Sequence, residues 1–185
     1  MTEKEKMLKG ELYNANYDKE LIKERQNIKD LCFKYNMVNP LNFEKRIKII
    51  KKIIGKIKGD FFIEQPFTCD YGYNIEIGNN FYSNHNLVIL DAGTVKIGDN
   101  VFIGPNCGIY TSGHPLEKDK RNKGLEYAHK IIIGNDVWIS GNVAILPGVT
   151  IGDNFVIGAG TVVNKNVPDN VVIAGNPFKI IKELN

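Results

Sequence analysis

Residues 131–163 decide the fold, and they read IIIGNDVWISGNVAILPGVTIGDNFVIGAGTVV. An aliphatic residue recurs at every sixth position of this stretch, and glycine directly follows several of them. These positions are Ile133, Ile139, Ile145, Ile151, Ile157 and Val163. The same period appears earlier at Ile97, Ile103 and Ile109, with a less regular copy that starts at Ile77. A period of six is typical of neither an α-helix nor a simple hairpin, but it is a known β-helix repeat.

Each six-residue unit is expected to form a short strand and a turn, and three units close one triangular coil. The recurring aliphatic side chain then points inward and stacks on its counterparts in the neighbouring coils. We expect glycines such as Gly98 and Gly134 to adopt the backbone angles of the corner, where a Cβ would clash. The prediction is therefore a mainly β protein, with a parallel β-helix over residues 61–185 that ends in a C-terminal tail.

Residues 1–60 follow a different pattern. Apolar residues recur three or four positions apart between Asp18 and Asn36 and again from Phe43 to Ile57, and Asn39-Pro40 separates the two stretches. This spacing predicts an N-terminal helical segment. The lysines on the outer side of the second helix are typical of a solvated surface.

The regular repeat is interrupted between Ile109 and Ile133. The intervening loop, residues 110–131, is polar and interrupted by glycines, as expected of a segment extruded from the coils. Long loops in a compact repeat domain are uncommon and usually functional. His114 and Glu126 lie in this loop.

Composition excludes several classes of function. The net charge is only +3, and no basic patch carries interleaved aromatic residues, so we expect no nucleic-acid partner. No apolar run approaches the roughly 20 residues that cross a membrane, and the charged N-terminus does not resemble a signal peptide. Cys32, Cys69 and Cys107 are far apart, as expected of reduced thiols in a cytoplasmic protein.

The chain resembles the maltose and galactoside O-acetyltransferases of the hexapeptide-repeat family over nearly its whole length. The segments that carry the resemblance are residues 2–13, 69–74, 111–116, 136–139, 147–153 and 174–177. The resemblance implies a left-handed β-helix and a homotrimer with active sites between subunits. It also implies acetyl transfer from acetyl-CoA, as co-substrate, to a hydroxyl of a maltose-, glucose- or galactoside-like sugar, with no metal required.

Acetyl transfer to a hydroxyl needs a base, donors for the tetrahedral oxyanion and a means of holding both substrates together. The resemblance gives His114 the role of general base, and an imidazole has a pKa near neutrality. Glu126 either orients this imidazole, contacts the acceptor or is a solvated carboxylate. The acceptor-binding residues that the resemblance implies are Asn16, Asp70, Asn84, Asp91 and Glu126. Asn84 and Asp91 also suit simple corner packing, and Asn16 is the best match in a segment one residue longer than in some relatives.

For the thioester, the resemblance places an oxyanion donor at the backbone N–H of Gly141, with room for the pantetheine arm beside Ala159. Trp138 either lines this channel or packs between subunits. The acetyl-CoA-binding residues implied are Trp138, Gly141, Ala159, Asn164, Lys165, Lys179 and Lys182. Relatives often have arginine at the last two positions, and lysine keeps the charge but loses the bidentate geometry.

Three alternatives stay open. Some hexapeptide β-helices are zinc-dependent carbonic anhydrases with three histidine ligands, but here no pair among His85, His114 and His129 has the short spacing expected on one coil. A second alternative is a non-catalytic trimeric scaffold. The third is an O-acetyltransferase that uses another small hydroxyl acceptor.

Overall fold

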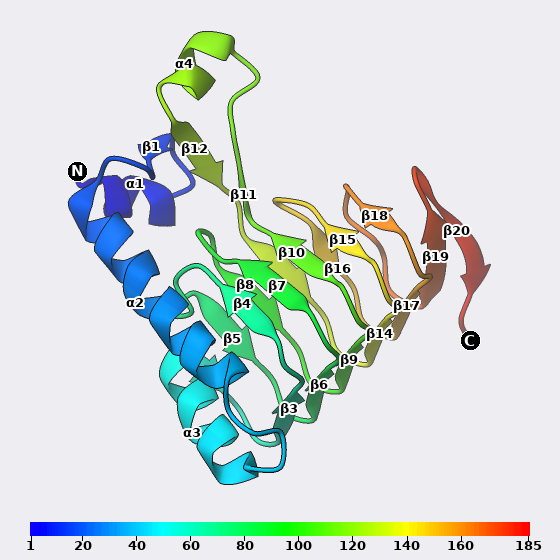
Figure 1. The fold of residues 1–185 in the computed structure, drawn as a ribbon. Helices are drawn as coiled ribbons and strands as arrows, with labels where there is room; N and C mark the ends of the chain where they lie inside the picture. Colours follow the sequence, from blue (N-terminus) through cyan, green and yellow to red (C-terminus); the bar gives the residue numbers. More distant parts are fainter.

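A triangular prism of three sheets forms the centre of the computed structural model, which covers residues 1–185 (Figure 1). Sheet 1 contains β2 (Lys56–Ile57), β5 (Ile75–Ile77), β8 (Val95–Ile97), β13 (Ile131–Ile133) and β16 (Thr150–Ile151). Sheet 2 contains β3 (Phe61–Ile63), β6 (Phe81–Ser83), β9 (Val101–Ile103), β14 (Val137–Ile139), β17 (Phe155–Ile157), β19 (Val171–Gly175) and β20 (Phe178–Glu183). Sheet 3 contains β4 (Phe67–Cys69), β7 (Leu87–Leu90), β10 (Gly108–Tyr110), β15 (Ala144–Ile145) and β18 (Val162–Val163).

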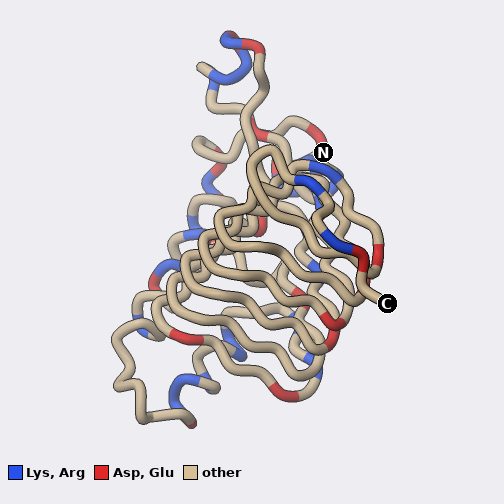
Figure 2. The backbone as a smooth tube through the Cα atoms, turned by 90° about the vertical axis from the view of Figure 1, so that its right-hand side faces the viewer, with Lys and Arg blue, Asp and Glu red and all other residues tan.

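The chain passes from sheet 1 to sheet 2 to sheet 3 and then begins the next coil. Neighbouring strands of each sheet run parallel, except for the antiparallel pair β19–β20 at the C-terminal end. The protein is therefore a left-handed parallel β-helix, as the repeat and the resemblance together predicted. Figure 2 shows most charged residues at turns, helices and the extruded loop, with few along the strands.

The recurring aliphatic residues face the inside of the prism, as predicted. Ile97 is in register with Ile133, which is in register with Ile151 in the next coil. All three side chains are buried and belong to one continuous core. Complete burial of such a side chain contributes about 1.5–3 kcal/mol, so the repeat itself supplies most of the apolar driving force for stacking the coils.

Glycine has a different role at the corners from the one predicted, which was to adopt the special backbone angles of the turn. Gly98 and Gly134 do not have a positive φ. They are required instead because a Cβ on Gly98 would lie 2.5 Å from the carbonyl oxygen of Gly134 in the next coil. The left-handed backbone position falls two residues later, at Asn100 and Asp136, both with φ near 57°. The Asn100 side chain donates a hydrogen bond to the Asp136 carboxylate at 2.8 Å, which links the corners of successive coils.

An N-terminal cap covers the first coils. It consists of α1 (Glu3–Leu8), β1 (Tyr13–Asn14), α2 (Lys19–Asn36) and α3 (Phe43–Ile53). Asp18 and Asn42 begin α2 and α3 with side chains that accept backbone N–H groups. None of the helices is long and apolar enough to cross a membrane.

The second predicted helix is shorter than expected. It ends at Ile53 rather than Ile57, because Ile54 is extended and the Gly55 N–H donates to the Gly72 carbonyl at 2.9 Å. A Cβ on Gly55 would lie 2.4 Å from the Tyr73 carbonyl oxygen, so only glycine permits this approach. Ile57 keeps its helical spacing in the sequence but belongs to β2, which pairs with β5 in the first coil.

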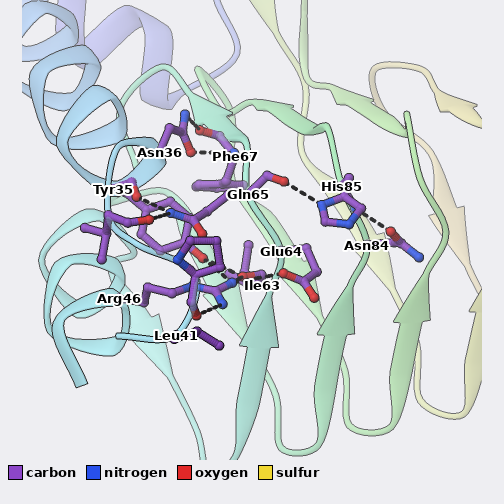
Figure 3. A network of polar contacts seen from close by, with 12 residues as sticks. Tyr35, Asn36, Leu41, Arg46, Ile63, Glu64, Gln65, Phe67, Asn84 and His85 are labelled. Atoms are coloured by element: carbon purple, nitrogen blue, oxygen red, sulfur yellow. Dashed lines mark hydrogen bonds and ion pairs between the residues drawn. The ribbon is translucent and has the colours of Figure 1, made fainter. Parts of the chain in front are cut away.

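A buried polar network joins the cap to the first coil (Figure 3). The Arg46 guanidinium on α3 is 4% exposed, donates to the Ile63 carbonyl at 2.7 Å and lies 3.1 Å from the Glu64 carboxylate. The Gln65 amide donates to the Tyr35 carbonyl at 2.6 Å. Because a buried charge without partners is costly, these contacts fix the cap in one position on the coils.

The loop between Ile109 and Ile133 projects from the prism as an arm (Figure 1). It contains β11 (Ser112–Gly113), α4 (Lys118–Asn122) and β12 (Leu125–Ala128). β12 pairs antiparallel with β11 on one side and with β1 of the cap on the other. The arm and the N-terminal segment therefore form one small sheet.

Candidate active site

A cavity of about 400 Å³ lies at the base of the arm, where the arm, the cap and the corner between sheets 3 and 1 meet. Four of the residues singled out from the sequence line it, and they are Asn16, Asp70, His114 and Glu126. They come from the N-terminal segment, the first coil and both strands of the arm. The fold thus brings together side chains that are up to about a hundred positions apart in the chain.

The imidazole of His114 is held by the backbone of the arm. Its Nδ1 atom lies 3.0 Å from the carbonyl oxygen of Leu125. Because a carbonyl only accepts, Nδ1 carries the proton in this contact and Nε2 keeps a free lone pair. Nε2 lies 3.9 Å from Oε1 of Glu126, beyond hydrogen-bond distance but close enough for the carboxylate to stabilise an imidazolium. This arrangement suits a base that takes a proton at Nε2.

Glu126 is itself held in place from the cap. The Tyr13 hydroxyl donates a hydrogen bond to Oε2 of Glu126 at 3.0 Å, while Oε1 faces His114. Tyr13 and Glu126 are register partners in the β1–β12 pair. Of the roles left open for Glu126, the single chain places it beside the imidazole, and it also lines the cavity.

Asp91 lies beneath the floor of the cavity and does not line it. Its Oδ1 accepts the backbone N–H groups of Asp70 and Tyr71 at 3.0 and 2.9 Å, and its Oδ2 is buried without a hydrogen-bond partner. Burial raises the pKa of Asp91 to about 6. In this chain Asp91 therefore supports the floor of the cavity, which the half-buried Asp70 lines. Burial also raises the pKa of Asp70, although the charges of Arg25 and Lys29 oppose this shift.

Sequence reasoning missed two cations of the cavity, Arg25 and Lys29 on α2. Arg25 donates to the Tyr71 hydroxyl and to the Ala15 carbonyl, each at 2.5 Å. Burial raises the pKa of Tyr71 to about 12. The four-residue spacing of Arg25 and Lys29 places them on one face of the helix, but nothing in the sequence indicates which face meets the arm.

A second group of predicted residues lies at another corner of the prism, between sheets 2 and 3. Asn84, Gly141 and Ala159 lie at this corner in the turns after β6, β14 and β17, and the turn after β9 separates the first of these from the second. The Gly141 carbonyl accepts the Gly160 N–H at 3.0 Å, and no group of the chain accepts a hydrogen bond from the Gly141 N–H. Trp138, on the adjoining face of sheet 2, is 56% exposed. None of these residues lines the cavity that contains His114.

The remaining predicted residues lie toward the C-terminal end. Asn164 and Lys165 follow β18 at the corner between sheets 3 and 1, and Lys179 and Lys182 lie on β20. All four are exposed. The Lys165 ammonium lies 5.1 Å from the centre of the Phe178 ring, which covers the end of the core.

The three histidines occupy different surroundings. His85 Nδ1 lies 2.6 Å from the Gln65 carbonyl oxygen (Figure 3), whereas the His129 ring stacks on Tyr127. The chain contains no group of three or more His, Cys, Asp or Glu side chains arranged to hold a metal ion. The three cysteines are free and buried, and the sulfur atoms of Cys32 and Cys69 lie 4.0 Å apart.

Comparison with known protein families matches both parts of the chain. Residues 6–59 match the maltose acetyltransferase hexapeptide capping motif. Residues 94–119 match the hexapeptide repeat of succinyl-transferase, and residues 130–165 match the bacterial transferase hexapeptide. The capping motif coincides with the helical cap, and the repeat motifs cover coils on either side of the arm, the first of them extending into the arm as far as residue 119.

Individual relatives cover almost the entire chain. The galactoside O-acetyltransferase of Escherichia coli (strain K12) is 47% identical over 165 residues, which is 89% of this chain and 81% of that protein. The crystal structure of a maltose O-acetyltransferase from Clostridium difficile 630 superposes with a TM-score of 0.98 at 48% identity, covering 100% of this chain and 98% of that one. A galactoside acetyltransferase in complex with coenzyme A gives 0.95 at 44% identity, covering 100% and 92%.

The repeat, the helical cap and the extruded arm thus occur together in relatives of nearly the same length. The chain belongs to the maltose and galactoside O-acetyltransferases of the hexapeptide-repeat family, and it is an acyltransferase.

Proposed function

We propose that the protein transfers the acetyl group of acetyl-CoA to a hydroxyl of a sugar, with His114 as the general base. The contact between His114 Nδ1 and the Leu125 carbonyl carries this proposal, because it leaves the Nε2 lone pair free to accept a proton. The coenzyme A bound to the related galactoside acetyltransferase supports acetyl-CoA as the donor.

The proposed reaction starts when Nε2 of His114 removes the proton of the acceptor hydroxyl as its oxygen attacks the thioester carbonyl. The carbonyl π electrons move to oxygen and form a tetrahedral oxyanion, which accepts a hydrogen bond from the Gly141 N–H. This N–H has no acceptor within the chain, which supports the assignment. Collapse re-forms the C=O bond, breaks the C–S bond, and the imidazolium returns its proton to the CoA thiolate. Glu126 stabilises the imidazolium between these two proton transfers. General base catalysis of this kind contributes about 10²–10⁴-fold to the rate.

The proposal requires neighbouring copies of the chain. His114 lies at the corner between sheets 3 and 1, whereas Gly141 lies at the corner between sheets 2 and 3 of the same prism. A single chain therefore cannot use both groups on one thioester. In the proposed homotrimer with sites between subunits, the His114 corner of one protomer would face the Asn84 and Gly141 corner of the next.

The acceptor is proposed to occupy the cavity of about 400 Å³ beside His114. Asp70 and Asn16 supply polar groups that can hydrogen-bond vicinal hydroxyls, and the neighbour's Asn84 would complete the set. On the donor side, Lys165, Lys179 and Lys182 provide cations for the CoA phosphates, and Gly141 and Ala159 leave room for the pantetheine arm. Trp138, which is exposed on the adjoining face of sheet 2, would line that channel.

The test is thiol release from acetyl-CoA with a panel of sugars and other small hydroxyl acceptors. His114→Ala is expected to reduce turnover by about 10²–10⁴-fold. His129→Ala is the matched control, since His129 is an exposed histidine at the end of the same arm but does not line the cavity. Turnover by His114→Ala at the parent rate, or a monomer in analytical ultracentrifugation, would refute the proposal. Turnover of only non-sugar hydroxyls would reassign the acceptor.

A further inference from the structure

We infer that Tyr13 is a positioning residue of this site, which holds Glu126 beside His114 from the N-terminal cap. The inference rests on the proposed role of His114 as the base. It assigns a function in the chemistry to the segment that precedes α2.

Tyr13 makes one directed contact through its hydroxyl. The side chain is fully buried, and its O–H donates to Oε2 of Glu126 at 3.0 Å. Oε1 of the same carboxylate lies 3.9 Å from Nε2 of His114. One carboxylate thus connects the buried phenol to the imidazole. Burial and the charge of Glu126 raise the pKa of Tyr13 far above its ordinary value, so the phenol remains a donor.

The backbone reinforces this connection. β1 pairs with β12 so that Tyr13 lies opposite Glu126 and Asn14 lies opposite Leu125. Both groups that face the His114 ring, the Leu125 carbonyl and the Glu126 carboxylate, therefore belong to the strand that β1 stabilises.

The cap holds β1 firmly. The Ala15 carbonyl accepts a hydrogen bond from Arg25 on α2 at 2.5 Å, and Tyr13 packs in a small second core. That core contains Met7, Tyr13, Ala15, Leu21, Tyr71, Ala92 and Ala128. It lies where the cap, the arm and the coils meet, so the position of β1 is determined by all three.

Loss of the Tyr13 hydroxyl would leave Glu126 free to turn toward solvent. A carboxylate near an imidazole stabilises its charged form. Without the hydroxyl, the imidazolium formed during the reaction should be less stable. The change acts on the chemical step rather than on the binding of acetyl-CoA.

Tyr13→Phe removes the hydroxyl and retains the buried ring. We expect kcat to fall about fivefold or more, with the KM for acetyl-CoA changed less than about twofold, since one hydrogen bond to a charged group is removed. The nitrogen-15 chemical shifts of the His114 ring, measured by NMR without substrate, should change, because the carboxylate beside the ring is no longer held there. Tyr17→Phe is the control, because Tyr17 is 72% exposed in the same segment, and it should change neither value.

Two further variants separate positioning from packing. In a Glu126→Gln background, Tyr13→Phe should reduce kcat by less than about twofold. The two substitutions affect the same contact, so their effects on kcat should not be additive. Glu126→Asp leaves β1 untouched but shortens the carboxylate, so it cannot reach both Tyr13 and His114. It should change the nitrogen-15 chemical shifts of the His114 ring even if Tyr13→Phe does not fold.

Equal losses from Tyr13→Phe in the parent and Glu126→Gln backgrounds would overturn the inference. So would a fall in kcat without any change in the nitrogen-15 chemical shifts of the His114 ring, since packing alone would then explain the effect. Unchanged shifts in Glu126→Asp would have the same consequence. If His114→Ala retains the parent activity, the proposed function fails, independently of any result for Tyr13.

Discussion

The Nδ1 atom of His114 and the carbonyl oxygen of Leu125 face each other across the arm at 3.0 Å. His114 directly follows β11, and Leu125 begins β12, so the hairpin that extrudes the imidazole also restrains it. A backbone carbonyl oxygen can only accept a hydrogen bond, so the proton of this contact must lie on Nδ1. The contact therefore determines which ring nitrogen is free.

We expect the neutral His114 ring to carry its proton on Nδ1. The carbonyl of Leu125 requires a donor there, whereas an Nε2–H tautomer would place two acceptors against each other. Nitrogen-15 NMR of the imidazoles above neutral pH measures this directly. His129, whose ring stacks on Tyr127, is the internal comparison. A predominant Nε2–H tautomer of His114 would contradict the assignment of Nε2 as the base.

Gly98→Ala should destabilise the protein more than Gly160→Ala. A Cβ on Gly98 would lie 2.5 Å from a backbone carbonyl of the next coil, and that overlap should cost about 3 kcal/mol. Gly160 has a φ of +72° with nothing within 4 Å of a new Cβ, so only the backbone strain of about 1 kcal/mol applies. Urea unfolding of both variants gives the comparison. Equal losses would mean that contact between coils does not explain the glycine.

Asp91 should make the stability of the protein fall as the pH rises from about 4 to 7. Its folded pKa of about 6 lies above the ordinary value of 3.8, so the folded state binds this proton more tightly. The contribution is complete below pH 4 and is lost as the pH rises through 6. One pH unit corresponds to about 1.4 kcal/mol, so the total is about 3 kcal/mol.

Asp91→Asn provides the measurement, because asparagine can still accept the N–H groups of Asp70 and Tyr71 but does not titrate. The free energy of unfolding of the parent minus that of the variant should decrease by this amount between pH 4 and 7. A difference that stays constant or increases over the same range would show that burial does not raise the pKa of Asp91.

Removal of the cations at the C-terminal end should weaken acetyl-CoA binding. A hydrogen bond to a charged group contributes about 1.5–3 kcal/mol, so Lys165→Ala or Lys179→Ala should raise the KM for acetyl-CoA about tenfold. The kcat at saturating acetyl-CoA should change little, and added salt should reduce the effect. Lys45→Ala on α3 is the matched control, since Lys45 is exposed and lies at the opposite end of the chain. Equal KM values for all three variants would place the phosphates elsewhere.

The six-residue period of aliphatic residues determined the β-helix, because inward stacking requires a side chain of the same kind at the same place in every strand. Ile133, Ile151 and the others are buried as that period predicts. The period also located the arm, through its interruption after Ile109. The prediction was wrong where tertiary contact overrides local spacing. Ile57 continues a helical pattern but pairs in a sheet, because Gly55 allows the chain to approach Tyr73.

The repeat, the cap and the arm can be predicted from the sequence, because each follows from the residue types and their spacing along the chain. Which of these residues meet depends on the folded structure. The sequence does not indicate that Tyr13 meets Glu126 or that Arg25 meets Tyr71, and the depth of the Asp91 carboxylate follows from the packing of the coils around it. His114 and Gly141 likewise lie at two different corners because each coil closes around three sheets. Spacing fixes the face on which a side chain lies, whereas its neighbours depend on how distant segments pack against that face.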